Sequence, residues 1–210
     1  LTEQIPLNHV PKNFYAQSHS LQLLRKEYLQ EHKPIPQSEN HFLKCGTISK
    51  KRRFMRILVL DASPKKVSDT MRATSMFVKG IEDLNQGDVI EVVKLINCEI
   101  KPCLGCLQCW KNMDGKCIQE DDQNTLLEKY VKADIIIFSF PLYCYSMPST
   151  LTAFFDRTIP LVKKSMSIEN EGVRHDSLVD FSKKRSVVLC GCGFPQFEDN
   201  FIGLKCQLNM

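Results

Sequence analysis

The chain of 210 residues is long enough for one domain with an appendage, and its 43% apolar and 25% charged residues are typical of a globular protein. Much of its net charge of +4 comes from the run Lys50–Arg53, which indicates a solvated linker and not a nucleic-acid-binding face. No apolar segment approaches the roughly 18 residues that span a membrane, and the N-terminus lacks the pattern of a signal peptide. We therefore expect a cytoplasmic protein, with no membrane and no nucleic-acid partner.

Residues 1–54 differ in composition from the rest of the chain. They hold four of the ten prolines and one helical pattern, from about Ser18 to Glu31. One short helix cannot build a core by itself. We expect residues 1–54 to be an arm or linker that packs on the main domain or on a partner chain, and residues 55–210 to be the domain.

From Met55 onward, short apolar runs alternate with helical patterns. MRILVLD and ADIIIFSF are typical of buried strands. Alternating strands and helices predict an α/β fold with a doubly wound parallel sheet. The expected elements, in chain order, are a strand over 55–61, a helix over 68–84, a strand over 88–95, a helix over 122–132, a strand over 133–140, a helix over 148–163 and a strand over 184–192.

Polar side chains follow the first strand, at the sheet edge where ligands bind in such folds. Ser63, Ser68 and Thr70 supply hydroxyls, Lys65 adds a positive charge, and the following helix begins with unpaired N–H groups. This combination suits a phosphate group. The alternative is a polar turn in which Ser68 is an ordinary N-cap.

The loop after the third strand is Pro141-Leu-Tyr-Cys-Tyr-Ser-Met-Pro148. Two prolines bracket an aromatic-rich turn, and a stiff loop of this kind can press N–H groups and rings against a flat heterocycle. The alternative is a rigid loop whose tyrosines pack on their neighbours.

These two loops carry a resemblance. The pattern S-P-K-x-x-S-x-T from Ser63, followed by P-x-Y-x-x-x-x-P-x-x-L-x-x-F-x-D-R from Pro141, resembles the NAD(P)H-dependent FMN reductase group of the flavodoxin-like superfamily. The cysteine-rich segment between them is similar to that of the iron–sulfur flavoprotein branch. The resemblance covers about residues 55–204.

The resemblance implies a flavodoxin-like parallel sheet in the order 2-1-3-4-5, with FMN at the carboxyl ends of strands one, three and four. It implies three groups of FMN-binding residues: Ser63, Lys65, Ser68 and Thr70 around the phosphate; Pro141, Leu142, Tyr143, Cys144 and Tyr145 along the ring; and Cys190, Gly191 and Gly193 on the other side of the flavin.

The chain departs from the family pattern in three ways. Asp69 places a carboxylate next to the expected phosphate, and Thr152 stands where the family usually has Lys. The chain ends at Met210, so we expect the fifth strand to be missing and the fourth strand to be a bare edge, which proteins normally cover.

Cys103, Cys106, Cys109 and Cys117 are spaced C-x2-C-x2-C-x7-C. Three close thiolates resemble a ferredoxin-type run, which predicts a [4Fe–4S] cluster. A four-thiolate zinc site and a set of free or reversibly oxidised thiols are the alternatives. Because this loop follows the second strand, we expect it on the flavin's side of the sheet, within electron-transfer reach of the ring or of a neighbouring subunit's ring.

The resemblance implies an FMN-dependent NAD(P)H oxidoreductase, flavin reductase-like, in which a [4Fe–4S] cluster relays electrons to a small-molecule or protein acceptor. The alternatives are a flavin and iron–sulfur electron carrier without a small-molecule substrate, and a thiol or zinc module that has lost flavin. We assign no acid or base. The bare edge and the arm predict a homo-oligomer.

Overall fold

The computed structural model describes residues 14–16, 54–84, 87–112, 115–169, 172–195 and 198–208. The expected helix over 18–31 and the run Lys50–Arg53 lie outside them. The strands are β1 (Phe14–Ala16), β2 (Arg56–Asp61), β3 (Val89–Lys94), β4 (Ile135–Pro141), β5 (Val162–Glu169), β6 (Gly172–Ser177) and β7 (Arg185–Gly191). The α-helices are α2 (Asp69–Leu84), α3 (Gln108–Asn112), α4 (Gln123–Lys132), α5 (Ser149–Asp156) and α6 (Ile202–Leu208), and 3-10 turns cover Leu95–Asn97, Ile159–Leu161 and Glu198–Phe201.

The main sheet has the order β1-β7-β4-β2-β3. Strands β3, β2, β4 and β7 are parallel to one another, which confirms the order 2-1-3-4 expected for the four strands found in the sequence. Each of these four parallel strands begins and ends within two residues of its predicted bounds. Helices α2 and α4 also begin and end within one residue of the predicted limits.

The position of the fifth strand is not bare. Strand β1 pairs antiparallel with β7, with Phe14 opposite Gly191 and Ala16 opposite Leu189. The prediction of an exposed fourth strand was therefore wrong. A strand from the N-terminal segment satisfies N–H and C=O groups of β7 that an edge leaves unpaired, and the sequence pattern gave no sign of so short a strand.

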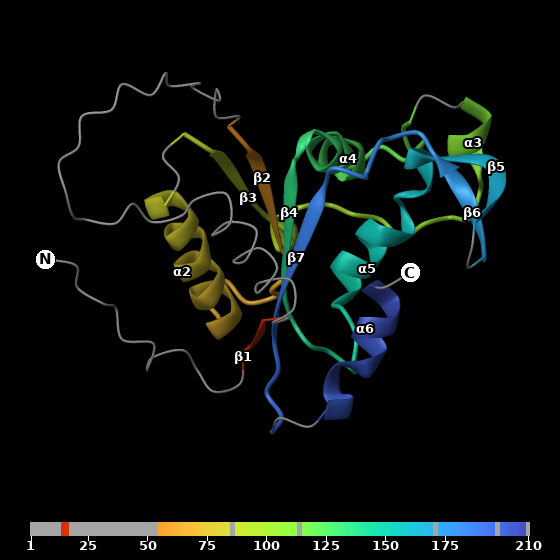
Figure 1. Cartoon of the computed structure of the whole chain (residues 1–210). Coiled ribbons are helices and arrows are strands. Elements are labelled where there is room, and N and C mark those ends of the chain that lie inside the picture. Colours follow the sequence, from red (N-terminus) through yellow and green to blue (C-terminus); the bar gives the residue numbers. More distant parts are fainter. Residues whose placement is uncertain are drawn as a thin grey trace, which may run out of the picture.

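Alternate residues of the strands enter two cores, one on each face of the sheet. Leu58 and Leu60 of β2 pack in the larger core, under α4, α5 and α6. Ile57 and Val59 pack in the smaller core, with Val78 of α2. Figure 1 shows α2 on one side of the sheet and α4, α5 and α6 on the other. Burial on both faces explains why the strands are apolar runs without alternation.

The helix predicted over 148–163 is wrong in its second half. Helix α5 ends at Asp156, and a 3-10 turn follows at Ile159–Leu161. Pro160 explains the stop, because it has no N–H to donate to the Asp156 carbonyl and its ring would clash with that carbonyl. The chain then forms the hairpin of β5 and β6, which the sequence did not predict.

Within the described ranges, no helix has both the length and the apolar character needed to cross a bilayer.

Candidate functional site

Two hydroxyls meet in the loop that joins β2 to α2. The oxygens of Ser63 and Ser68 lie 2.8 Å apart. Ser68 stands just before the helix and accepts a hydrogen bond from the Met71 N–H at 3.1 Å, so it is also the N-cap of α2. The pair lies at the start of a 16-residue helix, where the first N–H groups have no intrahelical partner. This arrangement suits an anion.

The neighbouring charges do not oppose an anion at this place. Lys65 is exposed, and Thr70 is buried, with a carbonyl that accepts a bond from Thr74 Oγ1. The Asp69 carboxylate lies 3.5 Å from Arg72 one turn along the helix. Asp69, which departs from the family pattern, therefore has a cationic partner on the helix surface.

Asp61, which the sequence analysis did not single out, lies beneath this loop. Its side chain is 3% exposed and accepts a hydrogen bond from the Ser63 N–H at 2.9 Å. Burial raises the pKa of Asp61, although the Ser63 hydrogen bond and Lys94 act in the opposite direction. Its position as the last residue of the strand was the available signal, since polar residues there face the ligand edge.

The loop after β4 makes a tight turn. The N–H of Tyr143 donates to the carbonyl of Ser146 at 3.0 Å, and the N–H of Ser146 donates back at 2.8 Å. The two residues between them, Cys144 and Tyr145, have φ angles of 49° and 61°. Two successive left-handed residues are typical of a type I′ turn, which normally takes Asn-Gly. Cys144 and Tyr145 therefore occupy a strained backbone conformation, and their N–H groups stay outside the Tyr143–Ser146 pairing.

The C-terminal segment supports this turn. The Ser146 hydroxyl donates to Oε1 of Gln207 on α6 at 2.8 Å, and a methyl group at Gly203 would come 3.0 Å from the Tyr145 carbonyl oxygen. The Leu142 N–H donates to the Gly191 carbonyl at 2.7 Å, which joins the loops after β4 and β7.

The predicted FMN-binding residues do not all present side chains. The side chain of Cys190 is 2% exposed and packs in the larger core, so only its backbone can face a ligand. Gly193 is exposed beside the buried Cys192. Tyr143 and Tyr145 are 45% and 60% exposed, which leaves both rings free to contact a bound molecule.

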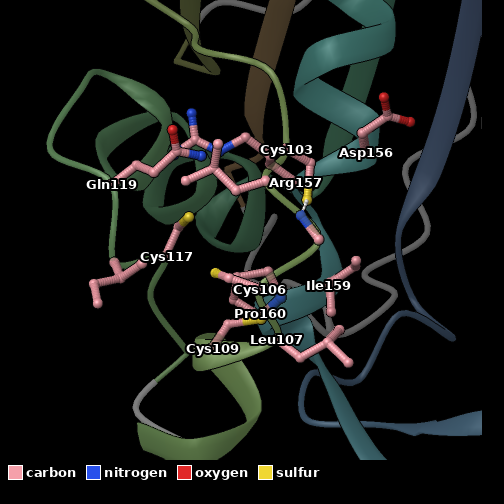
Figure 2. A pocket seen from close by; sticks show the side chains of 13 residues that line it. Cys103, Cys106, Leu107, Cys109, Cys117, Gln119, Asp156, Arg157, Ile159 and Pro160 are labelled. Atoms are coloured by element: carbon pink, nitrogen blue, oxygen red, sulfur yellow. Dashed lines mark hydrogen bonds between the residues drawn. The ribbon is translucent and has the colours of Figure 1, made fainter.

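All four clustered cysteines line one hollow, whose empty volume is about 360 Å³ with the open solvent at its mouth included. Cys103 and Cys106 are exposed, Cys109 and Cys117 are half-buried, and none of them forms a disulfide. The wall opposite them comes from the end of α5 and the turn after it, as Figure 2 shows with Arg157, Ile159 and Pro160.

Arg157, one of the residues that line the hollow, belongs to a buried ion pair. Arg157 donates two N–H groups to the two oxygens of Asp121, and both side chains are 0% exposed. Asp121 also accepts from the N–H groups of Lys101 and Gln123 at 2.9 and 3.1 Å. Burial acts to raise the pKa of Asp121, but the Arg157 guanidinium and then the Lys101 N–H hold that pKa below its usual value.

The pKa of Arg157 is displaced as well. Burial lowers it, but hydrogen bonds to Asp121 and then to the Cys117 thiol leave the pKa above its ordinary value. The side-chain amide of Gln123 donates to the Phe154 and Arg157 carbonyls at 3.0 and 3.2 Å, which ties the start of α4 to the end of α5. The Arg of the F-x-D-R pattern is thus a structural link between α5 and the cysteine loop.

Trp110 docks the cysteine loop on the hairpin. Its indole N–H donates to the Val162 carbonyl at 3.0 Å, and its ring centroid lies 5.0 Å from that of His175 on β6. Figure 1 places α3 beside β5 and β6 accordingly. The sequence analysis missed both residues, because the contact joins segments that are 52 residues or more apart.

The four cysteine side chains are the donor set that a cluster would use. In the described ranges, no three His, Cys, Asp or Glu side chains lie close enough together to hold one ion. A tetrahedral zinc site with bonds of about 2.3 Å needs sulfurs about 3.8 Å apart. In a [4Fe–4S] cube each thiolate binds a different iron, and four thiols that line one hollow can supply such ligands.

The cysteine hollow and the aromatic turn lie at opposite ends of α5. The turn ends at Pro148, directly before the helix, whereas Asp156 and Arg157 at its other end line the hollow. Eight helical residues rise about 12 Å. Residues 98–107 pass from the end of β3 to the end of α5 that lies away from the aromatic turn. The expectation that a cluster there lies within electron-transfer reach of the ring, or of a neighbouring subunit's ring, stays a prediction.

Comparisons with known proteins agree with this fold. The family described as having a flavodoxin-like fold matches residues 55–203. An iron-sulfur flavoprotein from Methanosarcina thermophila is 29% identical over 117 residues, which cover 56% of this chain and 59% of the relative. One from Clostridioides difficile (strain 630) is 31% identical over 111 residues, which cover 52% of this chain and 48% of the relative. The chain spans about half the length of the curated relatives it matches.

Two solved structures are similar in fold. An FMN-dependent NADH-azoreductase from Bacillus anthracis, in complex with FMN, has a TM-score of 0.56 and 18% identity, and the match covers 74% of this chain and 81% of the other. An NAD(P)H:quinone oxidoreductase from Methanothermobacter marburgensis has a TM-score of 0.53 and 21% identity, with coverage of 75% and 73%. At these identities the likeness concerns the fold alone.

Proposed function

The chain belongs to the flavodoxin-like fold family, and from this premise we propose that it is an FMN-dependent NAD(P)H oxidoreductase whose cysteine loop holds a [4Fe–4S] cluster. One observation carries the flavin part of the proposal. A hydroxyl pair at the start of α2 and a strained aromatic turn follow β2 and β4, two adjacent parallel strands that end at the same sheet edge.

Ser63, Ser68 and Thr70, with the first N–H groups of α2, bind the phosphate of FMN, and Lys65 adds positive charge nearby. The Ser63–Ser68 hydrogen bond shows that the two hydroxyls already converge, so little reordering precedes binding. Asp61 holds the loop from below through the Ser63 N–H.

Pro141, Leu142, Tyr143, Cys144 and Tyr145 flank the ring, and the backbone of Cys190, Gly191 and Gly193 closes the other side. Bound FMN supplies hydride acceptance from NAD(P)H and one- or two-electron transfer to an acceptor. The N–H groups of Cys144 and Tyr145 lie outside the turn's own pairing and can stabilise negative charge on a bound ring.

Cys103, Cys106, Cys109 and Cys117 hold the cluster. The shared hollow, the absence of disulfides among these four cysteines, and the names of the curated relatives, which are iron-sulfur flavoproteins, support this assignment. Free thiols in this number fit a reducing compartment, so we place the protein in the cytosol.

An electron carrier without a small-molecule substrate is the second candidate. The observation that favours it is the exposure of Cys103 and Cys106, which lets another protein approach a cluster closely.

Association of this chain into at least a dimer stays a prediction. It rests on the usual oligomeric state of the family that the sequence resembles, because β1 occupies the edge of β7 that was also expected to bind a second chain. Light scattering at micromolar concentration tests the mass.

The test is to purify the chain anaerobically, release its chromophore by heat and measure the mass. We expect FMN, together with NADH or NADPH oxidation in the presence of a quinone. FAD, or no flavin after reconstitution, would overturn the flavin assignment. Flavin without any pyridine-nucleotide oxidation would favour the electron carrier.

A further inference from the structure

One of the four clustered cysteines is held differently from the others. The N–H of Cys117 donates to Oδ1 of Asn124 at 2.8 Å, and the amide group of Asn124 donates back to the Cys117 carbonyl at 2.9 Å. Asn124 lies in the first turn of α4 and its side chain is half-buried. A single side chain therefore satisfies both backbone groups of Cys117, as a neighbouring strand would.

The sulfur of Cys117 lies beside a fixed cation. Of the five N–H groups of Arg157, one donates to the Lys101 carbonyl at 3.0 Å and two donate to Asp121. The guanidinium and the Cys117 thiol line the same hollow and interact electrostatically. Asp121 fixes the guanidinium in a bidentate pair, so the positive charge has little freedom to move away from the sulfur.

The segment 103–107 is held less firmly. The chain before it is held at Lys101 and Pro102, whose backbone groups bond to Asp121 and Gln119. Residues 103–107 are exposed, and the Cys103 sulfur accepts a hydrogen bond from Gly105 within the same loop, at 3.5 Å. Gly105 and Leu107 have φ angles of 61° and 52°, so the chain turns sharply on both sides of Cys106.

We propose that Cys117 is a fixed thiol of the four, that Asn124 and Arg157 are its positioning residues, and that the segment 103–107 adjusts to it when the four sulfurs bind iron. The inference rests on the proposed cluster. A ligand that is already held adds little ordering cost on binding, and the groups that orient a ligand affect affinity strongly.

The first test compares Asn124→Ala with Thr125→Ala, an exposed position on the same helix turn. Metal-free full-length chain is reconstituted anaerobically with ferrous iron and sulfide, and bound iron is measured across iron concentrations. We expect Asn124→Ala to need about tenfold more iron for half-loading, with Thr125→Ala unchanged. Equal loading of both variants would overturn the role of Asn124.

The second test needs no iron. Amide hydrogen exchange is measured on the metal-free chain. The Cys117 amide is expected to exchange about fivefold or more slowly relative to its intrinsic rate, and Asn124→Ala is expected to remove that protection. Exchange of Cys117 as fast as that of Cys106 in the unaltered chain would overturn the inference.

The third test concerns the sulfur. Arg157→Lys keeps the charge and loses the planar fork. We expect the loaded variant to have a lower cluster reduction potential, because a positive charge held beside a cluster raises the potential and the lysine ammonium lacks the bidentate pair that holds the guanidinium in place. A merely structural role would lower stability and leave the potential of the loaded fraction unchanged, and that result would remove Arg157 from the proposal.

Failure of the proposed function has a separate signature. If the unaltered chain binds FMN and takes up no iron, the cluster assignment is wrong, whatever Asn124 does. Hydrogen exchange then decides alone whether Cys117 is a fixed thiol: protection that depends on Asn124 supports it, and its absence overturns it.

Discussion

The two ends of α5 carry sites that are built in different ways. At its N-terminal end, the turn at Cys144 is closed by its own hydrogen bonds, and the Ser63 and Ser68 oxygens, in the loop before α2 at the same edge of the sheet, are 2.8 Å apart. At its C-terminal end, four thiols line a hollow that is open to solvent, next to one buried ion pair. At the first end the hydrogen-bonding groups already converge, whereas at the second end a buried Arg157–Asp121 pair lies next to the exposed residues 103–107.

The difference has a physical origin. Phosphate and a flat ring are recognised by N–H and O–H groups that a loop can orient before binding. Thiols have few hydrogen bonds with which to orient one another, so a cysteine loop takes its final shape when a metal group joins the sulfurs. Variants that change one end of α5 and leave the other end intact test this difference, and the largest expected effect comes first.

Arg157→Met should destabilise the chain by about 3–5 kcal/mol, because it leaves the buried Asp121 carboxylate without its cation. Urea unfolding of the metal-free, flavin-free chain measures the loss. Glu91→Gln is the control, since the exposed Glu91–Lys129 pair at 2.6 Å should contribute about 0–1 kcal/mol. FMN affinity at the other end of α5 should not change in the fraction that stays folded. A loss no larger than that of Glu91→Gln would contradict the role given to the ion pair.

Ser63→Ala and Ser68→Ala should each weaken FMN binding by about 1.5–3 kcal/mol, because each removes a hydrogen bond to a charged phosphate. Fluorescence titration of the flavin measures the affinity. Iron loading should stay the same, just as Arg157→Met should leave FMN affinity unchanged in the folded fraction. Ser186→Ala, at an exposed position of β7, is the control. An unchanged affinity in the double variant would refute the phosphate site.

Cys144→Gly should stabilise the flavin-free chain by about 0.5–1 kcal/mol. Relief of a left-handed residue is worth roughly 1–2 kcal/mol, and the added freedom of the unfolded chain removes roughly 0.4–1 kcal/mol. Thermal unfolding measures the gain. Cys206→Gly, at an exposed position of α6, should instead destabilise slightly, because glycine is a poor helix former. A loss of stability in Cys144→Gly would mean that the turn carries no strain.

The smallest effect is a difference in pH dependence between the two ends. The lowered pKa of Asp121 means that its contribution to stability is present above about pH 4 and is lost as the pH falls through the folded-state value. The raised pKa of Asp61 acts in the opposite sense. Its contribution is present below about pH 4 and is lost as the pH rises through the folded-state value.

Unfolding free energies measured from pH 3 to pH 7 test both signs. Asp121→Asn should flatten the acid side of the stability curve, and Asp61→Asn should flatten the decline on the neutral side. The amide oxygen that Asp61→Asn introduces would still accept the Ser63 hydrogen bond. Parallel curves for Asp61→Asn and the unaltered chain would show that burial of Asp61 has no effect on its titration.

The sequence by itself determined the order of the four parallel strands and of α2, α4 and the first half of the helix after β4, because periodicity and apolar runs act over a few neighbouring residues. It also predicted the two loops at which we propose that FMN binds, since ligands of such sheets lie at the carboxyl ends of strands and the motifs there are local. The four cysteines were equally visible, because their spacing is short.

The tertiary structure decided what joins distant segments. Arg157 and Asp121 are 36 residues apart, and β1 reaches β7 from the other end of the chain. The path of the cysteine loop to the far end of α5 depends on that ion pair and on the docking of Trp110. No local pattern encodes such contacts, because each gains its free energy only when the whole chain has folded and buried the partners together.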